Sequence, residues 1–242
     1  MRRRWWLAAL GSLVAAFGSA HAEEARAEQS LVAQLTKAAP AANPQVLSLA
    51  AHAADCARRQ GLLDGFRHLA VIDYSLPSTQ PRLWVFDVTR GRLLFQELVA
   101  HGRNTGERSA ERFSNIEGSK MSSLGLFQTA ETYYGSNGYS LRLRGLDAGF
   151  NDNALARAIV MHGASYVSEA LADRVGRIGR SWGCPAVRQE VARTVIDTLK
   201  GGALIFAYYP DRKWLTESPM LRCGDTRPTP VMASLVSAAP RG

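Results

Sequence analysis

The sequence predicts a mainly β fold: a β-sandwich with peripheral helices and an N-terminal helical segment. From His68 onward, short runs of β-branched, aromatic and other large apolar residues recur, and turn residues divide them. Few helical patterns separate these runs, so the chain lacks the strict strand–helix alternation of a parallel sheet. Before His68, the apolar residues repeat at helical spacing instead.

The first 22 residues have the pattern of a cleaved secretory signal. Arginines fill positions 2–4, the stretch 5–17 is apolar, and Ala-His-Ala at 20–22 is a small-x-small cleavage site. The apolar stretch is shorter than the ~20 residues of a membrane-spanning helix, so we expect no stable membrane insertion. We therefore expect the mature protein to cross the inner membrane and to reside in the periplasm or cell envelope.

Charge and length narrow the class of partner. Removing these 22 of the 242 residues leaves 220, and the loss of three arginines lowers the net charge from +8 to +5. That length suits one domain with an accessory segment, and a mildly basic chain suits an anionic envelope polymer. No dense run of lysines and arginines contains interleaved aromatic residues, so we expect no nucleic-acid partner.

The mature chain divides into three parts. Residues 23–65 form an N-terminal helical segment, in which Asn43 caps a helix expected over 44–60. Residues 66–210 form the β domain. The tail 211–242 has four prolines and little periodicity, so we expect it to be irregular.

The β domain contains seven expected strands. They cover 68–75, 82–89, 92–100, 124–132, 139–146, 155–163 and 203–210, the second and third forming a hairpin. We expect residues 101–122 to form a loop. Two helices interrupt the β pattern: one over 167–174, and one that begins at Pro185, has apolar residues every fourth position and ends at Gly201.

The chain has three cysteines, an odd number for an exported protein. The simplest partition in an oxidising compartment joins Cys56 to Cys223 and leaves Cys184 free. The alternative is three free thiols, with Cys56 buried as a small apolar residue.

The stretch GRSWGCPAVR at 179–188 places a thiol on a constrained turn. Pro185 suits the first position of a helix, so Cys184 would lie at the N-cap, where the helix dipole and unpaired N–H groups lower a thiol pKa. The N–H groups of Trp182 and Gly183 would add an oxyanion site beside the sulfur. The alternative is an inert buried thiol or a disulfide partner.

His162 is the best candidate base for a nucleophilic Cys184, because it ends an apolar strand and precedes Gly163. The alternative is a structural histidine bonded to backbone. His101 ends another strand and could approach the same pocket. A metal site from these two histidines and Cys184 would lack the close-spaced ligand pairs of zinc sites, so we expect neither a metal nor another cofactor.

Two motifs around these residues, MHGASY and GRIGRSWGCPAV, resemble the catalytic signature of the murein L,D-transpeptidases, the YkuD-like family. That signature is a His-Gly followed by Ser-x-Gly-Cys on a turn, and a branch of the family has Trp-Gly-Cys-Pro-Ala-Val. The stretches VAHGRNTG, FSNIEGSKMSSLGLF, YYGSNGYSLRLRGL and GFNDNALARAIVMHGA are similar to the same branch. The resemblance covers roughly residues 65–210.

The resemblance implies a β-sandwich enzyme that acts on peptidoglycan stem peptides. Cys184 would attack the carbonyl between meso-diaminopimelate and the terminal D-Ala of a tetrapeptide, and D-Ala would leave. An amine from a second stem peptide would then resolve the thioester into a 3→3 cross-link. His162 would be the general base, oriented by a backbone carbonyl, and carbapenem-type inhibitors would acylate Cys184.

We assign six residues to the oxyanion and substrate pocket: Ser181, Trp182, Gly183, Gly163, Arg188 and His101. The common family pattern has an arginine two residues after the cysteine, but this chain has Ala186 there. Arg188 is a candidate substitute by its charge.

Two alternatives to a transpeptidase stay open. One is a hydrolase with the same Cys–His dyad, an L,D-carboxypeptidase or endopeptidase that uses water as the acceptor. The other is a non-catalytic envelope-binding domain in which Cys184 is silent. Only this last reading predicts that Cys184→Ala leaves every activity unchanged.

Overall fold

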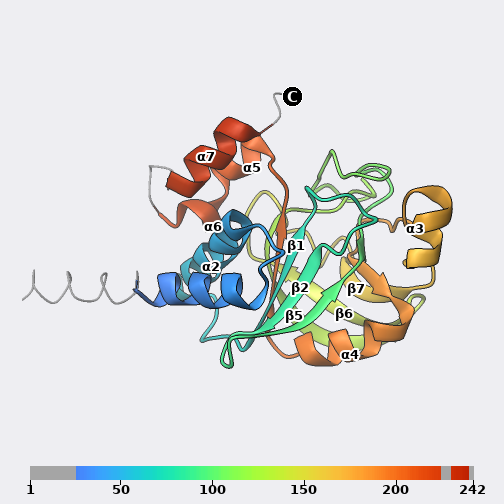
Figure 1. Ribbon diagram of the computed structural model, residues 1–242, viewed down its shortest axis with the longest axis horizontal. Helices are drawn as coiled ribbons and strands as arrows, with labels where there is room; N and C mark the ends of the chain where they lie inside the picture. The colour runs from blue at the N-terminus through green and yellow to red at the C-terminus, as the bar shows by residue number, and fades with distance from the viewer. Residues whose placement is uncertain (1–25, 225–229, 240–242) are drawn as a thin grey trace, which may run out of the picture.

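The computed structural model describes residues 26–224 and 230–239, so the predicted signal segment 1–22 lies outside the described residues. The centre of the fold is one nine-stranded sheet with the strand order β3-β2-β1-β9-β5-β6-β7-β8-β4 (Figure 1). The strands are β1 (His68–Asp73), β2 (Leu83–Asp87), β3 (Arg92–Glu97), β4 (Val99–Ala100), β5 (Gly125–Gly135), β6 (Gly138–Gly145), β7 (Val160–Ala164), β8 (Ala186–Arg188) and β9 (Leu204–Tyr208).

The sheet curls back on itself until it is nearly a barrel. Its two edge strands, β3 and β4, are separated in the chain by Leu98 alone, so the chain itself brings the two edges together. Most neighbouring strands are antiparallel, and the pairs β1–β9 and β7–β8 are parallel. The mainly β fold with peripheral helices is confirmed, and β2 and β3 form the predicted hairpin.

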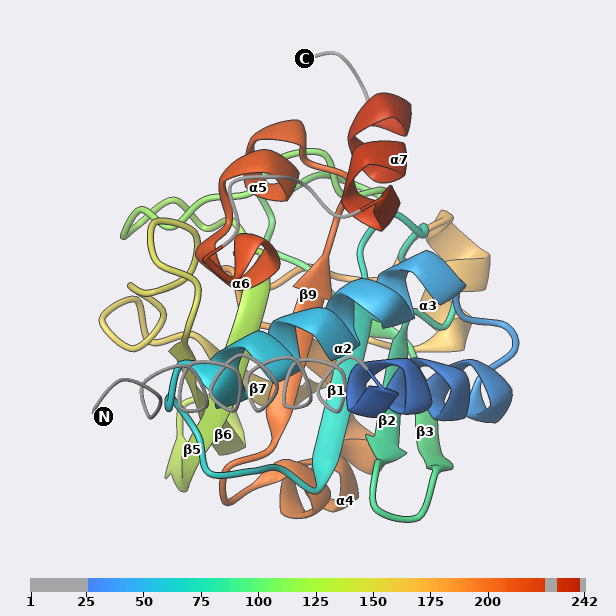
Figure 2. The ribbon, with the colours of Figure 1, turned by 90° about the vertical axis from the view of Figure 1, so that its left-hand side faces the viewer.

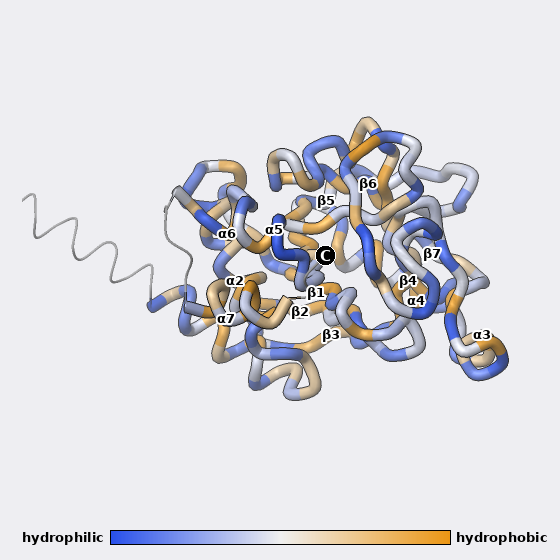
Figure 3. Tube along the Cα trace, turned by 90° about the horizontal axis from the view of Figure 1, so that it is seen from above, coloured by the Kyte–Doolittle hydropathy of each residue, from blue (hydrophilic) through white to orange (hydrophobic). Residues whose placement is uncertain are grey.

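A helical layer covers one side of the sheet (Figures 2 and 3), and we define it as α2 (Pro44–Arg59), α5 (Arg212–Glu217), α6 (Pro219–Arg222) and α7 (Pro230–Ala238). Helix α2 (Pro44–Arg59) packs on β1, β5 and β9, and a further helix covers residues 26–38. The Asn43 side chain accepts a hydrogen bond from the backbone N–H of Gln45, which is the predicted cap. Figure 3 shows α3 (Glu169–Val175) and α4 (Gln189–Leu199) on the other side.

The C-terminal tail is helical where we expected it to be irregular. It contains α5 (Arg212–Glu217), α6 (Pro219–Arg222) and α7 (Pro230–Ala238). The first two are too short for a periodic pattern, but their caps are present in the sequence: the side chains of Asp211 and Ser218 accept hydrogen bonds from backbone N–H groups of the first turns.

Two buried features fasten this tail to the rest of the protein. The structure joins Cys56 of α2 to Cys223 after α6 in a disulfide, and the two Cα atoms are 5.4 Å apart. The buried carboxylate of Asp147 accepts hydrogen bonds from the Trp214 indole N–H at 2.9 Å and from the Ser218 hydroxyl at 2.8 Å. Burial raises the pKa of Asp147 to about 6, because the charged form loses hydration.

The predicted helix from Pro185 was wrong at its beginning. Residues Ala186–Arg188 form β8, which pairs with β7 and β4, and α4 begins only at Gln189. Local periodicity could not separate the two, because Val187 fits both the helical repeat and a buried strand. Tertiary pairing decides in favour of the strand.

The predicted strand over 155–163 was also wrong in its first half. Residues 151–158 form consecutive turns, and β7 begins at Val160. Ala158 has a left-handed backbone, with φ of 53°, which interrupts any extended conformation.

Among the described residues, the structure has no helix that is both long and apolar enough to span a membrane.

Candidate active site

Cys184 and His162 line one cleft of about 350 Å³. The parallel pairing of β7 and β8 brings them together, because Ala186, two residues after the cysteine, is in register with His162. The other lining residues are Ser136, Asn137, Tyr166, Arg180, Ser181 and Trp182. Ser136 and Asn137 form the tip of the β5–β6 hairpin, so this tip lies at the cleft.

The His162 ring is held in one orientation by its own strand. Its Nδ1–H donates a hydrogen bond to the carbonyl oxygen of Gly163 at 2.9 Å. This assigns the proton to Nδ1 and leaves Nε2 as an acceptor. Burial lowers the pKa of His162, and the Gly163 carbonyl partly offsets that effect. A neutral imidazole with a free Nε2 can accept a proton.

The Cys184 thiol is nearly buried, with 8% of the residue exposed. The backbone N–H of Val160 donates to its sulfur at 3.5 Å. Burial raises the pKa of Cys184, and the Val160 N–H and the Arg157 guanidinium partly offset the rise. The expected low thiol pKa was wrong, because Cys184 precedes a strand and not a helix. The resting pair is therefore a neutral thiol and a neutral imidazole.

Ser181 organises the Cys184 turn, which we define as residues 181–185. Its hydroxyl donates to the Cys184 carbonyl oxygen at 2.6 Å and accepts from the Gly183 N–H at 3.1 Å. The Gly183 N–H is therefore already bonded, which removes it from the predicted oxyanion donors. Among the described residues, no acceptor bonds the N–H groups of Trp182 and Cys184, so these are the donors that remain.

Gly183 is required by the backbone of this turn. Its φ is +124°, and a Cβ here would lie 2.7 Å from the Met121 carbonyl oxygen. The Ser122 hydroxyl donates to the Gly183 carbonyl at 3.0 Å and accepts from the Gly102 N–H, also at 3.0 Å. The segments around Gly102 and Ser122, which are distant in the sequence, thus hold the Cys184 turn in place by hydrogen bonds.

His101 lies behind the Cys184 turn and does not line the cleft. Its Nδ1 accepts from the buried Arg82 guanidinium at 2.7 Å, and its Nε2–H donates to the Gly106 carbonyl at 3.2 Å. Burial and the Arg82 charge lower the pKa of His101 to about 4. Its backbone carbonyl accepts from the Ser181 N–H, so His101 supports the turn and makes no contact with the cleft.

Two other predicted pocket residues, Arg188 and Gly163, do not line the cleft. Arg188 forms a two-pronged ion pair with Glu97, at 2.8 and 2.9 Å, so its charge is already compensated. Gly163 faces α4, since a Cβ there would lie 2.7 Å from the Ala192 Cβ. Gly163 reaches the site through its carbonyl alone. Trp182 is different, because it lines the cleft and 70% of it is exposed.

Sequence reasoning missed Arg157, the cation whose charge acts on the Cys184 thiol. Its guanidinium donates to the carbonyls of Ser114 and Met121, at 2.7 and 2.6 Å, and to the hydroxyls of Ser119 and Ser123. It therefore fixes the loop that packs on Gly183. No role was predicted for it, although it lies in the stretch GFNDNALARAIVMHGA that is similar to the family branch and follows the turn-forming Asn-Asp-Asn.

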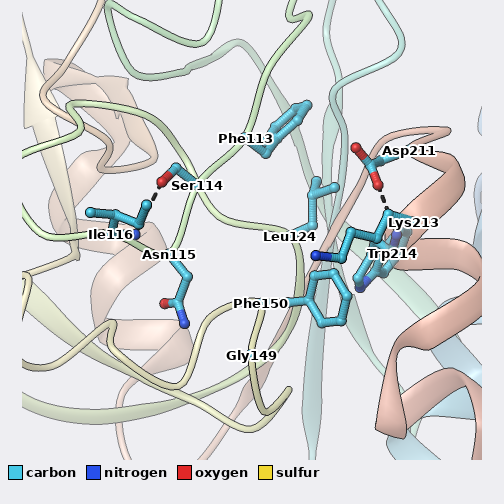
Figure 4. A pocket seen from close by; sticks show the side chains of 10 residues that line it. All are labelled: Phe113, Ser114, Asn115, Ile116, Leu124, Gly149, Phe150, Asp211, Lys213 and Trp214. Atoms are coloured by element: carbon cyan, nitrogen blue, oxygen red, sulfur yellow. Dashed lines mark hydrogen bonds between the residues drawn. The ribbon is translucent and has the colours of Figure 1, made fainter. Parts of the chain in front are cut away.

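A second cleft, of about 280 Å³, lies beside α5 (Figure 4). Phe113, Phe150 and Trp214 give it an aromatic wall, and Lys213 reaches into it. Neither a thiol nor an imidazole lines it, so it has no dyad of the kind formed by Cys184 and His162.

In the part of the chain that the structure describes, no group of three or more His, Cys, Asp or Glu could hold a metal ion.

The family match decides the classification. A family model described as the L,D-transpeptidase catalytic domain matches residues 38–208. The chain belongs to the L,D-transpeptidase catalytic domain family. The match begins inside the predicted helical segment, so that segment contributes to the family domain. No curated protein matches the chain.

Several solved structures are similar to this chain. An L,D-transpeptidase from Mycobacterium smegmatis has 14% identity over 60% of both chains, with a TM-score of 0.38. The L,D-transpeptidase LdtMt1 in complex with imipenem has 14% identity over 60% of both chains and a TM-score of 0.36. L,D-transpeptidase 3 from Mycobacterium tuberculosis with a faropenem-derived adduct has 15% identity over 60% and 61%, with a TM-score of 0.36. The chain thus spans about three fifths of the length of each of these proteins.

Proposed function

We propose that this family member is a cysteine-dependent peptidoglycan L,D-transpeptidase of the cell envelope. One observation carries the proposal: Cys184 and His162 line the same cleft, and the Gly163 carbonyl holds the imidazole with Nε2 free to accept a proton. The family match supports the reaction class. Export to the envelope, where stem peptides occur, rests on the signal-like residues 1–22.

The proposed reaction begins with a neutral thiol. The Cys184 sulfur attacks the carbonyl carbon of the donor tetrapeptide while His162 Nε2 takes the thiol proton. The negative charge on the carbonyl oxygen is placed opposite the free N–H groups of Cys184 and Trp182. Collapse breaks the C–N bond, the leaving D-Ala amine takes the proton from His162, and a thioester remains.

The second half of the reaction returns the enzyme to its starting state. The amine of a second stem peptide attacks the thioester, His162 removes a proton from that amine, and the protonated imidazole returns the proton to the departing sulfur. With water in place of the amine, the same steps give hydrolysis. The acceptor that reaches the thioester therefore decides between a 3→3 cross-link and a carboxypeptidase product.

Intact-mass spectrometry after incubation with imipenem tests the nucleophile. We expect one drug adduct on the wild-type protein, none on Cys184→Ala, and slow formation on His162→Ala. A solved family member in complex with imipenem makes this β-lactam a suitable probe. An adduct that survives in Cys184→Ala would overturn the proposal.

Product analysis separates transfer from hydrolysis. The protein is incubated with a disaccharide-tetrapeptide, with and without a second stem peptide as acceptor, and the products are identified by mass. A 3→3 dimer with release of D-Ala supports the transpeptidase. Tripeptide as the sole product, at every acceptor concentration, would assign the hydrolase reading instead.

A further inference from the structure

The cations around the Cys184 cleft differ in whether they already have a partner. Arg188 is paired with Glu97, and Arg180 donates to the Glu107 carboxylate at 2.6 Å. Arg157 is bonded to two carbonyls and two hydroxyls of the 114–123 loop. Each of these three guanidiniums therefore already has a carboxylate, carbonyl or hydroxyl partner within the protein.

Lys120 differs from these three arginines. No carboxylate or carbonyl of the described residues bonds its ammonium group. The ammonium nitrogen lies over the Trp182 ring, 4.8 Å from the ring centroid. Trp182 lines the cleft and is largely exposed, so the Lys120 ammonium lies against a residue of the cleft wall.

The backbone holds Lys120 in this place. Its φ is 55°, in the left-handed region that residues other than glycine and asparagine seldom adopt. The Lys120 carbonyl accepts from the Asn104 N–H at 3.2 Å, and Gly102 packs so closely that a Cβ there would lie 2.5 Å from that oxygen. The next residue, Met121, contacts Gly183. Strained conformations of this kind concentrate where a side chain must be presented in a fixed position.

We propose that Lys120, with Trp182 as its support, binds the terminal carboxylate of the donor peptide. The inference rests on the proposed function, because a tetrapeptide donor carries a free carboxylate on the residue that leaves. The bond to be broken lies one residue from that carboxylate, so a donor bound at Cys184 holds its carboxylate close to the cleft wall, of which Trp182 is a part. The ion pair would select donors that end in a free acid over otherwise identical donors that end in an amide.

Binding to the Cys184→Ala variant tests the anchor without any reaction. We would titrate it with two tetrapeptides that differ only in a terminal carboxylate or carboxamide, and measure both affinities by calorimetry. We expect the acid to bind about tenfold more tightly, as one partly exposed charge-assisted contact allows. Adding Lys120→Asn should reduce this ratio to about one, because asparagine tolerates the left-handed backbone but carries no charge.

Two further variants separate the anchor from general charge effects. Lys120→Arg keeps the cation and should keep the preference for the acid. Lys213→Asn removes one positive charge in the second cleft and should leave the ratio unchanged. Equal binding of acid and amide by the Lys120-containing protein would overturn the anchor, as would a loss of preference in Lys213→Asn.

The same pair of peptides, given to the protein with its thiol intact, reports on the proposed function separately. We expect Lys120→Asn to lower kcat/KM for the acid about tenfold and to leave kcat/KM for the amide unchanged. An equal fall for both donors would show a structural role and overturn the anchor. If neither donor is turned over while the acid still binds selectively, the proposed function fails and the anchor stands.

Discussion

The Cys184 turn and the helical layer are held in place by different kinds of interaction. The turn depends on short polar contacts between loops: Ser181 to Cys184, Ser122 to Gly183 and Arg157 to Met121. The helical layer depends on apolar packing of α2 against the sheet, on the disulfide and on the bonds to Asp147. The geometry of the Cys184 turn is set by polar contacts, and the stability of the helical layer is set by burial and a disulfide.

This difference predicts how the two regions respond to change. A perturbation of the turn moves the sulfur relative to His162 or removes a charge that acts on it, so it changes the rate more than the stability. A perturbation of the helical layer removes buried area or a covalent restraint, so it changes the stability more than the rate. Variants of the two regions should therefore separate effects on the rate from effects on the stability.

Replacing His162 with Ala should have the largest effect on the rate. Loss of a positioned general base costs about 10²- to 10⁴-fold, and we expect that loss in the acylation rate with imipenem. The melting temperature should change little. A rate within threefold of the wild-type value would remove His162 as the base.

The pH dependence of the wild-type rate checks the same residue. Burial holds the pKa of His162 below its ordinary value of 6.5, so the neutral, competent imidazole is the main form above that lowered value. The acylation rate should therefore rise as the pH increases through a value below 6.5. It should fall only at the acid end, where the imidazole becomes protonated. A rising limb centred above 6.5 would contradict the burial argument.

The double replacement Cys56→Ser and Cys223→Ser should lower the stability and leave the acylation rate unchanged. The disulfide closes a long loop, with a sequence separation of 167 residues. Its loss should lower the free energy of unfolding by about 2–5 kcal/mol, measured by urea denaturation. The imipenem acylation rate per folded molecule should be unchanged. A rate loss as large as that of His162→Ala would show that the helical layer also sets the geometry of the site.

Replacing Ser181 with Ala should change both properties moderately. The substitution leaves the Gly183 N–H and the Cys184 carbonyl without their partner in a buried turn. Such unsatisfied groups cost about 1–3 kcal/mol, and the loosened turn should slow acylation. Ser136→Ala, at the hairpin tip of the same cleft, is the matched control and should leave stability unchanged.

The comparison also explains what the sequence could predict. The α2 helix follows from one capping residue and a repeating apolar face, and β1, β2 and β9 follow from local composition, because local patterns encode these elements. The Cys184 turn does not follow in this way. Its conformation depends on Ser122, Gly102 and Arg157, which no spacing relates to Cys184. Val187 is an example of the resulting error. Local periodicity predicted a helix there, but pairing with Gly163 and Val99 places Val187 in a strand.

Residue motifs performed better than local geometry at the site itself. The Gly-Cys-Pro and His-Gly motifs drew attention to Cys184 and His162, which the structure places in one cleft. The residues assigned by charge or position alone, Arg188 and His101, do not line that cleft. Arg188 is bound to Glu97, and His101 is bound to Arg82. Both partners are distant in the sequence from the residue that they bind. Side-chain pairing between distant residues is the information that a single sequence lacks.

The smallest effect we expect is on the titration of the thiol itself, when replacing Arg157 with Met removes a charge that acts on Cys184 and the hydrogen bonds that hold the 114–123 loop. Burial raises the pKa of Cys184, and the Arg157 charge opposes that rise, so removing the charge should raise the pKa further. We expect the midpoint of the iodoacetamide alkylation profile to move to higher pH, because a nearby positive charge favours the thiolate. Arg157→Lys keeps a cation but loses part of the hydrogen bonding to the loop, so it separates the two roles. A midpoint restored by Lys assigns the shift to charge. A midpoint that stays high in both variants assigns it to the loop that Arg157 holds against Gly183, and the Cys184 turn would then be even more dependent on its polar contacts.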